Sequence, residues 1–85
     1  MKVELFLSPV CPHCPAARKV FFAVADRRTG DSFEEVNTYT DAGIERGMSL
    51  QVMAVPTVAV DGVIKIVGWP FDEADLENAI DGSVK

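Results

Sequence analysis

Two cysteines, Cys11 and Cys14, lie two residues apart between an apolar strand-like run at residues 3–7 and a helical pattern that follows them. Two thiols at a strand-to-helix junction are typical of dithiol–disulfide chemistry. The alternating side chains of the run suggest a strand with both faces covered, because an apolar Phe6 occupies the second face. The junction therefore predicts an α/β fold with a reactive dithiol at one end of a central strand.

Length and charge limit the classes of protein that this chain can belong to. Its 85 residues suffice for one domain with a modest core, so we assign residues 1–85 to a single domain. The net charge of −5 is spread along the chain, which argues against nucleic acid and against a membrane surface as partners. No apolar run is long enough for a membrane span or a signal peptide, so we expect a cytoplasmic location. We also expect a monomer.

The hydrophobic pattern predicts alternating strands and helices along the whole chain. The expected strands are 2–7, 33–38, 55–60 and 63–67, and the expected helices run from about 12 to 27, from 40 or 41 to about 48, and from 72 to about 80. Asp61-Gly62 predicts a tight type I′ turn between the last two strands. The order β-α-β-α-β-β-α makes the first two strands parallel and the last two antiparallel, in a four-stranded mixed sheet with helices on both faces.

These motifs resemble the thioredoxin superfamily. The resemblance rests on Cys-x-x-Cys between a strand and a helix, on Val55-Pro56-Thr57 before a β-hairpin, and on Gly68 after it. The size is similar to that of small glutaredoxin/thioredoxin-like proteins common in archaea. The resemblance implies a thioredoxin-like fold and a thiol–disulfide oxidoreductase, acting as a protein-disulfide reductase or redox carrier. It implies protein disulfides as substrates, a thioredoxin-reductase-like electron donor, and no cofactor beyond a redox-active disulfide between the two cysteines.

The four residues from Cys11 to Cys14 carry the expected chemistry. Unpaired backbone N–H groups and the helix dipole should stabilise the thiolate of Cys11, which makes it the expected nucleophile. Cys14, one turn into the helix, should be more buried and act as the resolving thiol. Pro12 and His13 lie between them, and this dipeptide resembles that of the oxidising DsbA proteins. His13 is either a tuner of the thiolate or an exposed bystander.

The family resemblance also implies a substrate-binding surface. It implies a cis Val55-Pro56 bond beside the dithiol, with Thr57 completing the motif and the backbone of Val55 pairing with a substrate's extended chain. Gly68 would let a partner approach closely. Trp69 belongs either to this rim or to the core. The residues before the first cysteine and after Gly68 depart from the glutaredoxin pattern, which argues against efficient glutathione binding.

Three other interpretations use the same residues. The cysteines could bind or deliver a metal or an iron–sulfur cluster, but a zinc shell needs four ligands and only Cys11, Cys14 and His13 are at hand. They could also be inert core residues, or a vestigial dithiol in an interaction domain.

Thioredoxins carry a buried acid in the strand before the dithiol, and Glu4 is the one candidate here; we expect a solvated edge carboxylate instead.

Overall fold

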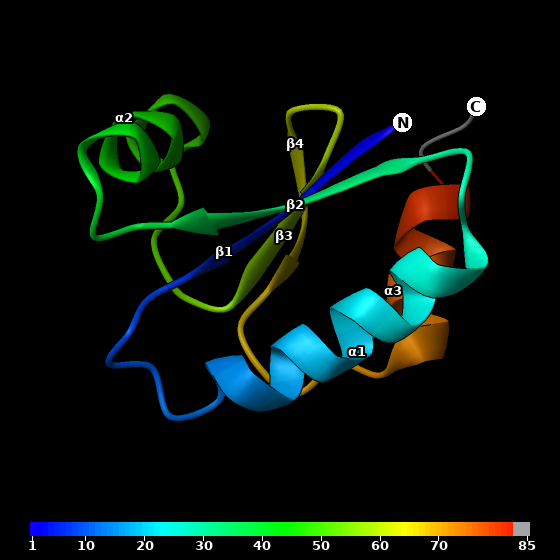
Figure 1. Cartoon of the computed structure of the whole chain (residues 1–85). Coiled ribbons are helices and arrows are strands. Elements are labelled where there is room, and N and C mark those ends of the chain that lie inside the picture. Colours follow the sequence, from blue (N-terminus) through cyan, green and yellow to red (C-terminus); the bar gives the residue numbers. More distant parts are fainter. Residues whose placement is uncertain (83–85) are drawn as a thin grey trace.

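The computed structural model describes residues 1–82 and has the predicted order of elements, β-α-β-α-β-β-α (Figure 1). The last three residues of the predicted domain lie outside the described residues. None of the helices within residues 1–82 is long and apolar enough to cross a membrane. The elements are β1 (Lys2–Leu7), α1 (Cys14–Arg27), β2 (Ser32–Asn37), α2 (Asp41–Leu50), β3 (Thr57–Val60), β4 (Val63–Val67) and α3 (Glu73–Asp81).

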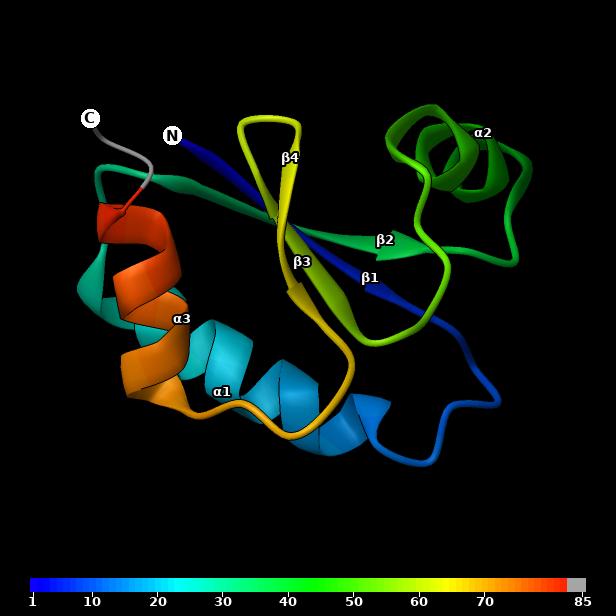
Figure 2. The same ribbon diagram turned by 180° about the vertical axis from the view of Figure 1, so that it is seen from behind.

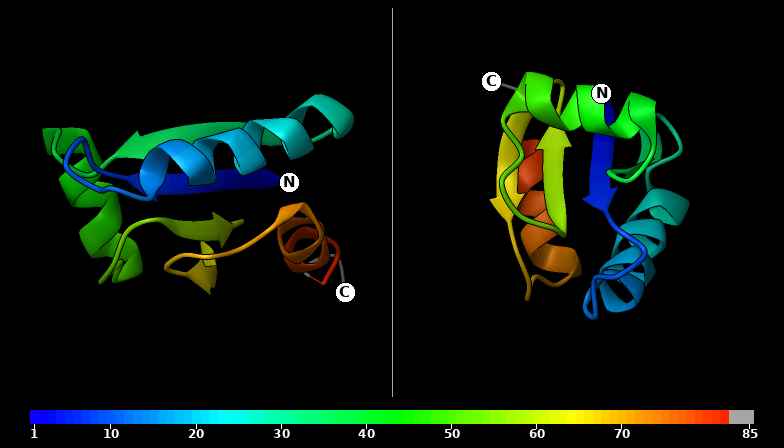
Figure 3. Two further views of the ribbon diagram at one scale, coloured as in Figure 1. Left: turned by 90° about the horizontal axis from the view of Figure 1, so that it is seen from below. Right: turned by 90° about the vertical axis from the view of Figure 1, so that its left-hand side faces the viewer.

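The four strands form one mixed sheet in the order β2-β1-β3-β4, which confirms the predicted fold class. β1 runs parallel to β2 and antiparallel to β3, and β3 and β4 form the predicted hairpin. Helices α1 and α3 cover one face of the sheet and α2 lies on the other (Figures 1 and 2). In the right-hand view of Figure 3, α2 lies in front of the strands and α3 lies behind them.

The core lies between the sheet and the pair α1 and α3. β1 is a central strand, so its side chains alternate between two covered faces. Val3 and Leu5 face α1 and α3, and both are fully buried. Phe6 faces α2 and is also fully buried, as the prediction of a strand covered on both faces requires. The core cluster joins β1, α1, β3 and α3 through Val3, Leu5, Leu7, Cys14, Ala17, Phe21, Val24, Val58, Val60, Phe71, Leu76 and Ile80.

The predicted exposure of Glu4 is wrong. Glu4 is only 2% exposed, and its carboxylate accepts two hydrogen bonds from the Arg46 guanidinium of α2, at 3.0 and 2.8 Å. The reason is the central position of β1, which leaves no edge at which this carboxylate could meet water. The hydrogen bonds with Glu4 raise the pKa of Arg46, so the guanidinium keeps its charge. Glu4 faces α2, away from the face that buries Cys14.

Two element boundaries differ from the predicted ones near the dithiol. α1 begins at Cys14 instead of Pro12, because the backbone N–H of Cys11 bonds to the Ser8 carbonyl at 3.3 Å and closes a separate turn first. His13 is the N-cap of the helix. β3 begins at Thr57, two residues later than predicted, because residues 54–56 form a bend ahead of it.

Turn and cap chemistry elsewhere follows the sequence prediction. Asp61 and Gly62 have φ values of 50° and 81°, the two positive values that a type I′ turn needs. Thr40 caps α2, which runs two residues past the predicted end, to Leu50. Asp72 and Asp75 form a reciprocal capping box at the start of α3. These local interactions fix where the hairpin reverses and where the helices start.

The buried ion pair predicts an asymmetric response to mutation. Arg46→Met should lower the free energy of unfolding by at least about twice as much as Glu4→Leu, because it strands a buried carboxylate without its partner. In Glu4→Leu, by contrast, the Arg46 guanidinium is still partly exposed and can be hydrated. Urea unfolding of both variants measures the two losses.

Lys2→Met is the matched control, because it removes a cation from an exposed pair with Glu34. Its effect on stability should be small. Equal losses in Arg46→Met and Glu4→Leu would contradict the asymmetry.

Candidate active site

The fold brings Cys11 against the segment that precedes β3. The Cys11 Sγ approaches the carbonyl oxygen of Val55 at 3.8 Å, across a sequence separation of 44 residues. A thiol is a weak hydrogen-bond donor, so Cys11 in its reduced form can donate to this carbonyl. The Val55-Pro56 peptide bond is cis, as predicted. The expected nucleophile and the expected substrate-presenting backbone are therefore neighbours.

Cys14 differs from Cys11 in its environment. It is the first residue of α1 and is 3% exposed, whereas Cys11 is half-buried, and both are free thiols. Burial raises the pKa of Cys14 to about 11, assisted by a hydrogen bond with Cys11 and opposed by one with the Ser8 backbone. The thiol of Cys14 is therefore protonated at neutral pH in the reduced protein. The predicted difference in burial between the two cysteines is confirmed.

His13 and Trp69 form the rim on one side of the dithiol. Their rings stack with centroids 6.5 Å apart and an interplanar angle of 15°. Trp69 also contacts Phe71 edge-to-face at 5.3 Å and packs against the core. Trp69 therefore packs against the core and also stacks with His13. Its contact with a substrate stays a prediction. Pro12 is exposed in the turn that precedes the helix.

The remaining predicted residues meet around the cis-proline. Pro56 is buried, and its carbonyl oxygen accepts a hydrogen bond from the Gly68 N–H at 2.8 Å. The hydroxyl of Thr57 donates to the Ala54 carbonyl at 2.6 Å, so this buried side chain holds the bend in place. Gly68 has a φ of 81°, a conformation that favours glycine, and open space where a Cβ would lie.

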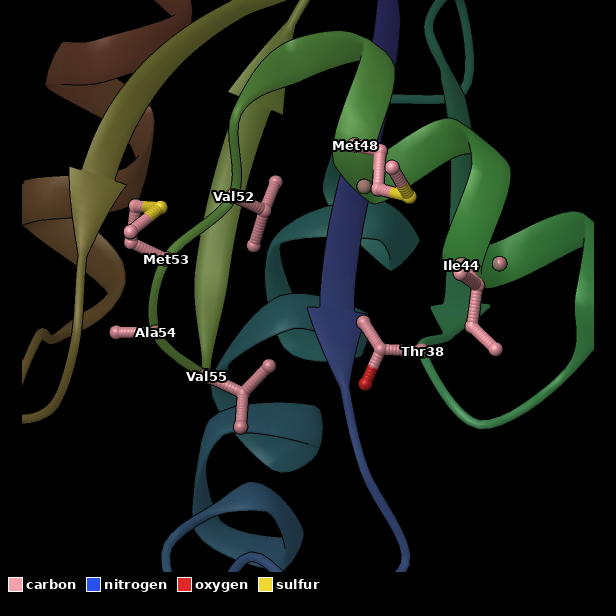
Figure 4. Close-up of a pocket in the computed structure, with 9 residues that line it drawn as sticks. Thr38, Ile44, Met48, Val52, Met53, Ala54 and Val55 are labelled. Carbon is pink, nitrogen blue, oxygen red and sulfur yellow. The ribbon is translucent and has the colours of Figure 1, made fainter.

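An apolar groove beside the dithiol was missed from the sequence. It has a volume of about 300 Å³ and lies between α2 and the loop that leads to β3 (Figure 4). Met53 is 90% exposed and Met48 is 74% exposed. Val55 lines the groove and its carbonyl contacts Cys11, so this residue connects the groove with the dithiol. The apolar side chains that line it are Ile44, Met48, Val52, Met53, Ala54 and Val55.

The sequence carried a signal for this groove. In a chain of 85 residues, two of the three methionines lie within six positions of each other just ahead of the Val55-Pro56 bond. Exposed methionines are adaptable contacts at surfaces that bind varied partners. In the sequence, however, Ile44 and Met48 are spaced like the buried stripe of an ordinary helix.

A second hollow, of about 310 Å³, lies on the α1 side of the dithiol and was also missed. Both cysteines line it, together with an ion pair between α1 and β2. The Arg18 guanidinium donates two hydrogen bonds to the Glu35 carboxylate, at 2.9 and 2.7 Å, and this raises the pKa of Arg18.

Residues 1–82 contain no group of three His, Cys, Asp or Glu side chains placed to hold a metal ion.

The environment of Cys14 predicts its reactivity toward alkylation. In a Cys11→Ser variant, iodoacetamide should modify Cys14 very slowly at neutral pH, because burial keeps the thiol protonated. Between about pH 7 and 10 the rate should rise roughly tenfold per pH unit, as the thiolate fraction grows. Mass spectrometry after timed quenching measures this rate. Rapid modification that levels off near pH 8 would contradict the raised pKa.

Comparison with known proteins agrees with this site. A model of the family described as "Thioredoxin domain" matches residues 1–81. The chain is 39% identical over 77 residues to a thioredoxin of Methanocaldococcus jannaschii, covering 91% of this chain and 89% of that protein. It is 36% identical over 87 residues to a probable thioredoxin of Methanothermobacter marburgensis, covering 100% of this chain and 98% of that protein.

Solved structures show the same fold at lower sequence identity. Thioredoxin O2 of Arabidopsis thaliana superposes with a TM-score of 0.76 at 24% identity, covering 99% of this chain and 75% of that one. Thioredoxin 1 of Thermosipho africanus superposes with a TM-score of 0.74 at 20% identity, covering 99% of this chain and 94% of that one. With a reactive dithiol, a cis-proline beside it and a family match over residues 1–81, the chain belongs to the thioredoxin domain family and is a thiol–disulfide oxidoreductase.

Proposed function

We propose that this protein exchanges disulfides with other proteins, with Cys11 as the nucleophile and Cys14 as the resolving thiol. The observation that carries the proposal is the position of Cys11, half-buried against the Val55 carbonyl, with Cys14 buried behind it at the start of α1. A substrate can therefore reach the first sulfur but not the second. This division of access is what a two-step exchange requires.

The reaction is balanced by the two thiols alone. The Cys11 thiolate attacks one sulfur of the substrate disulfide, forms a mixed disulfide and releases the first substrate thiolate. Cys14 then loses its proton and attacks the Cys11 sulfur, which releases the second substrate thiolate and leaves a disulfide between Cys11 and Cys14. No cofactor takes part, and two electrons from a thioredoxin-reductase-like donor restore the dithiol.

Both cysteines of the chain belong to this dithiol, so neither is used as a structural staple. Chains that use their cysteines in this way are typical of reducing compartments. We therefore propose that the exchange takes place in the cytoplasm.

Two surfaces beside Cys11 support recognition of protein substrates. The backbone ahead of Pro56 can pair with an extended segment of the substrate, while Gly68 leaves open space next to it. The apolar groove continues from Val55 towards α2 and would receive an apolar side chain of the same segment. Its exposed methionines can adapt to side chains of different shape, which suits a protein with several substrates.

The two cysteine variants should fail at different steps. Cys11→Ser should abolish reduction of insulin disulfides, because no accessible thiol remains. Cys14→Ser should still attack but should accumulate the mixed disulfide, which non-reducing electrophoresis and mass spectrometry detect. A mixed disulfide on Cys14 in the Cys11→Ser variant, formed as fast as the one on Cys11, would reverse the assigned roles.

The groove predicts a difference between large and small disulfides. Met53→Glu should lower kcat/KM for a protein disulfide about tenfold, because covering a methionine side chain contributes about 1.5 kcal/mol to binding. Reaction with a small disulfide that does not reach the groove should not change. Val63→Glu, an exposed position on β4 outside the groove, is the matched control. Equal losses with both disulfides would place the effect of Met53 on the dithiol instead of the groove.

A further inference from the structure

The resolving step requires Cys14 to lose its proton inside the protein. Cys14 is 3% exposed, and burial raises the pKa of its thiol to about 11, so few molecules carry the thiolate at neutral pH. Glu4 is not placed to accept this proton, because it lies on the face of β1 opposite to the one that buries Cys14. A carboxylate that accepts this proton would have to come from another element that meets the Cys14 side of the sheet.

The hollow on the α1 side of the dithiol contains a candidate. Among the described residues that line it, the ionisable ones are Cys11, Cys14, Arg18 and Glu35. Glu35 pairs with Leu5 in the parallel register of β2 and β1, which puts it on the sheet face that carries α1. Among the described residues that line this hollow, Glu35 is therefore the only carboxylate.

The hollow also has room and hydrogen-bond partners for water molecules that would carry the proton. Its volume of about 310 Å³ exceeds by several times the roughly 30 Å³ that one water molecule occupies in the liquid. Polar groups of Ser8 and Asn37 line it in addition to the ion pair, so a short chain of water molecules would find hydrogen-bond partners there. The Glu35 side chain is 29% exposed, which leaves it a route for returning the proton to solvent.

We propose that Glu35 accepts the proton of Cys14 during the resolving step, through water in this hollow, and that Arg18 is its positioning residue. The proposal rests on the proposed function, because it concerns the second half of the same exchange. Arg18 holds the carboxylate by two hydrogen bonds, one from Nε and one from the terminal nitrogen, which fixes its direction.

The charges in the hollow balance during this transfer. Before it, the hollow holds a neutral Cys14 thiol and the ion pair of Arg18 and Glu35. After it, Glu35 is neutral, and the Arg18 cation faces a new Cys14 thiolate, so the net charge is unchanged. The thiolate then forms a bond to the Cys11 sulfur, the bond from Cys11 to the substrate sulfur breaks, and the substrate leaves as a thiolate. The proton on Glu35 passes to solvent.

Stopped-flow reaction of the reduced protein with the chromogenic disulfide DTNB separates the two steps. Attack by Cys11 releases the first coloured thiolate, and attack by Cys14 releases the second. Glu35→Gln should slow the second phase at pH 7 by at least about tenfold and leave the first phase within about twofold. In this variant the second phase should also rise roughly tenfold per pH unit, because hydroxide must remove the proton, while the wild-type profile stays flatter.

Glu34→Gln is the matched control, because Glu34 is the neighbouring acid on β2 but faces the other side and pairs with Lys2. It should leave both phases unchanged. A normal second phase in Glu35→Gln would overturn the proposal, and so would an equal slowing of both phases with a lowered melting temperature.

If Glu35→Gln does not fold, Glu35→Asp should keep the flat pH profile at a reduced rate, and a steep profile would overturn the proposal. Absence of the first phase in the wild-type protein would instead overturn the proposed function.

Discussion

The antiparallel pairing of β1 with β3 is the interaction on which the site depends. Its last pair joins Phe6 to Thr57, at the end of the sheet where the chain leaves β1 for the dithiol and enters β3 from the cis-proline. Because β1 and β3 are adjacent, the two loops emerge side by side. The contact between the Cys11 sulfur and the Val55 carbonyl follows from this pairing. Without it, the dithiol would have no backbone beside it to which a substrate could bind.

Covering both faces of β1 has different consequences for a thiol and for a carboxylate. On the α1 side, burial keeps the Cys14 thiol neutral, which separates a resolving cysteine from the accessible Cys11. On the α2 side, the buried Glu4 carboxylate takes the Arg46 guanidinium as its partner. A neutral group tolerates burial alone, whereas a charged one has to be paired. The same layered architecture therefore produces a reactive site on one face and a structural ion pair on the other.

Most of the fold and the centre of the site could be predicted from local patterns. Cys11 and Cys14 are recognised by their spacing at a strand-to-helix junction, and the hairpin by Asp61-Gly62. The cis Val55-Pro56 bond was predictable only through the family resemblance, since an isolated X-Pro bond is cis in about 5–6% of cases. The predicted start of α1 is two residues too early, because it rests on Pro12 as a first-turn proline; Ser8-Pro9, a pattern typical of β-turns, marks the separate turn that ties Cys11 to Ser8.

The sequence by itself determined the order of the elements, the dithiol and the caps and turns, because each depends on residues within a few positions of one another. The tertiary structure decided which residues from distant elements meet. It pairs the buried Glu4 with Arg46 and stacks Trp69 with His13. It also places Glu35 of β2 at the hollow that Cys14 lines. These contacts depend on the strand order, the register and the face of the sheet that each helix covers. No spacing along the chain encodes them, and they exist only once the sheet has formed with β1 at its centre.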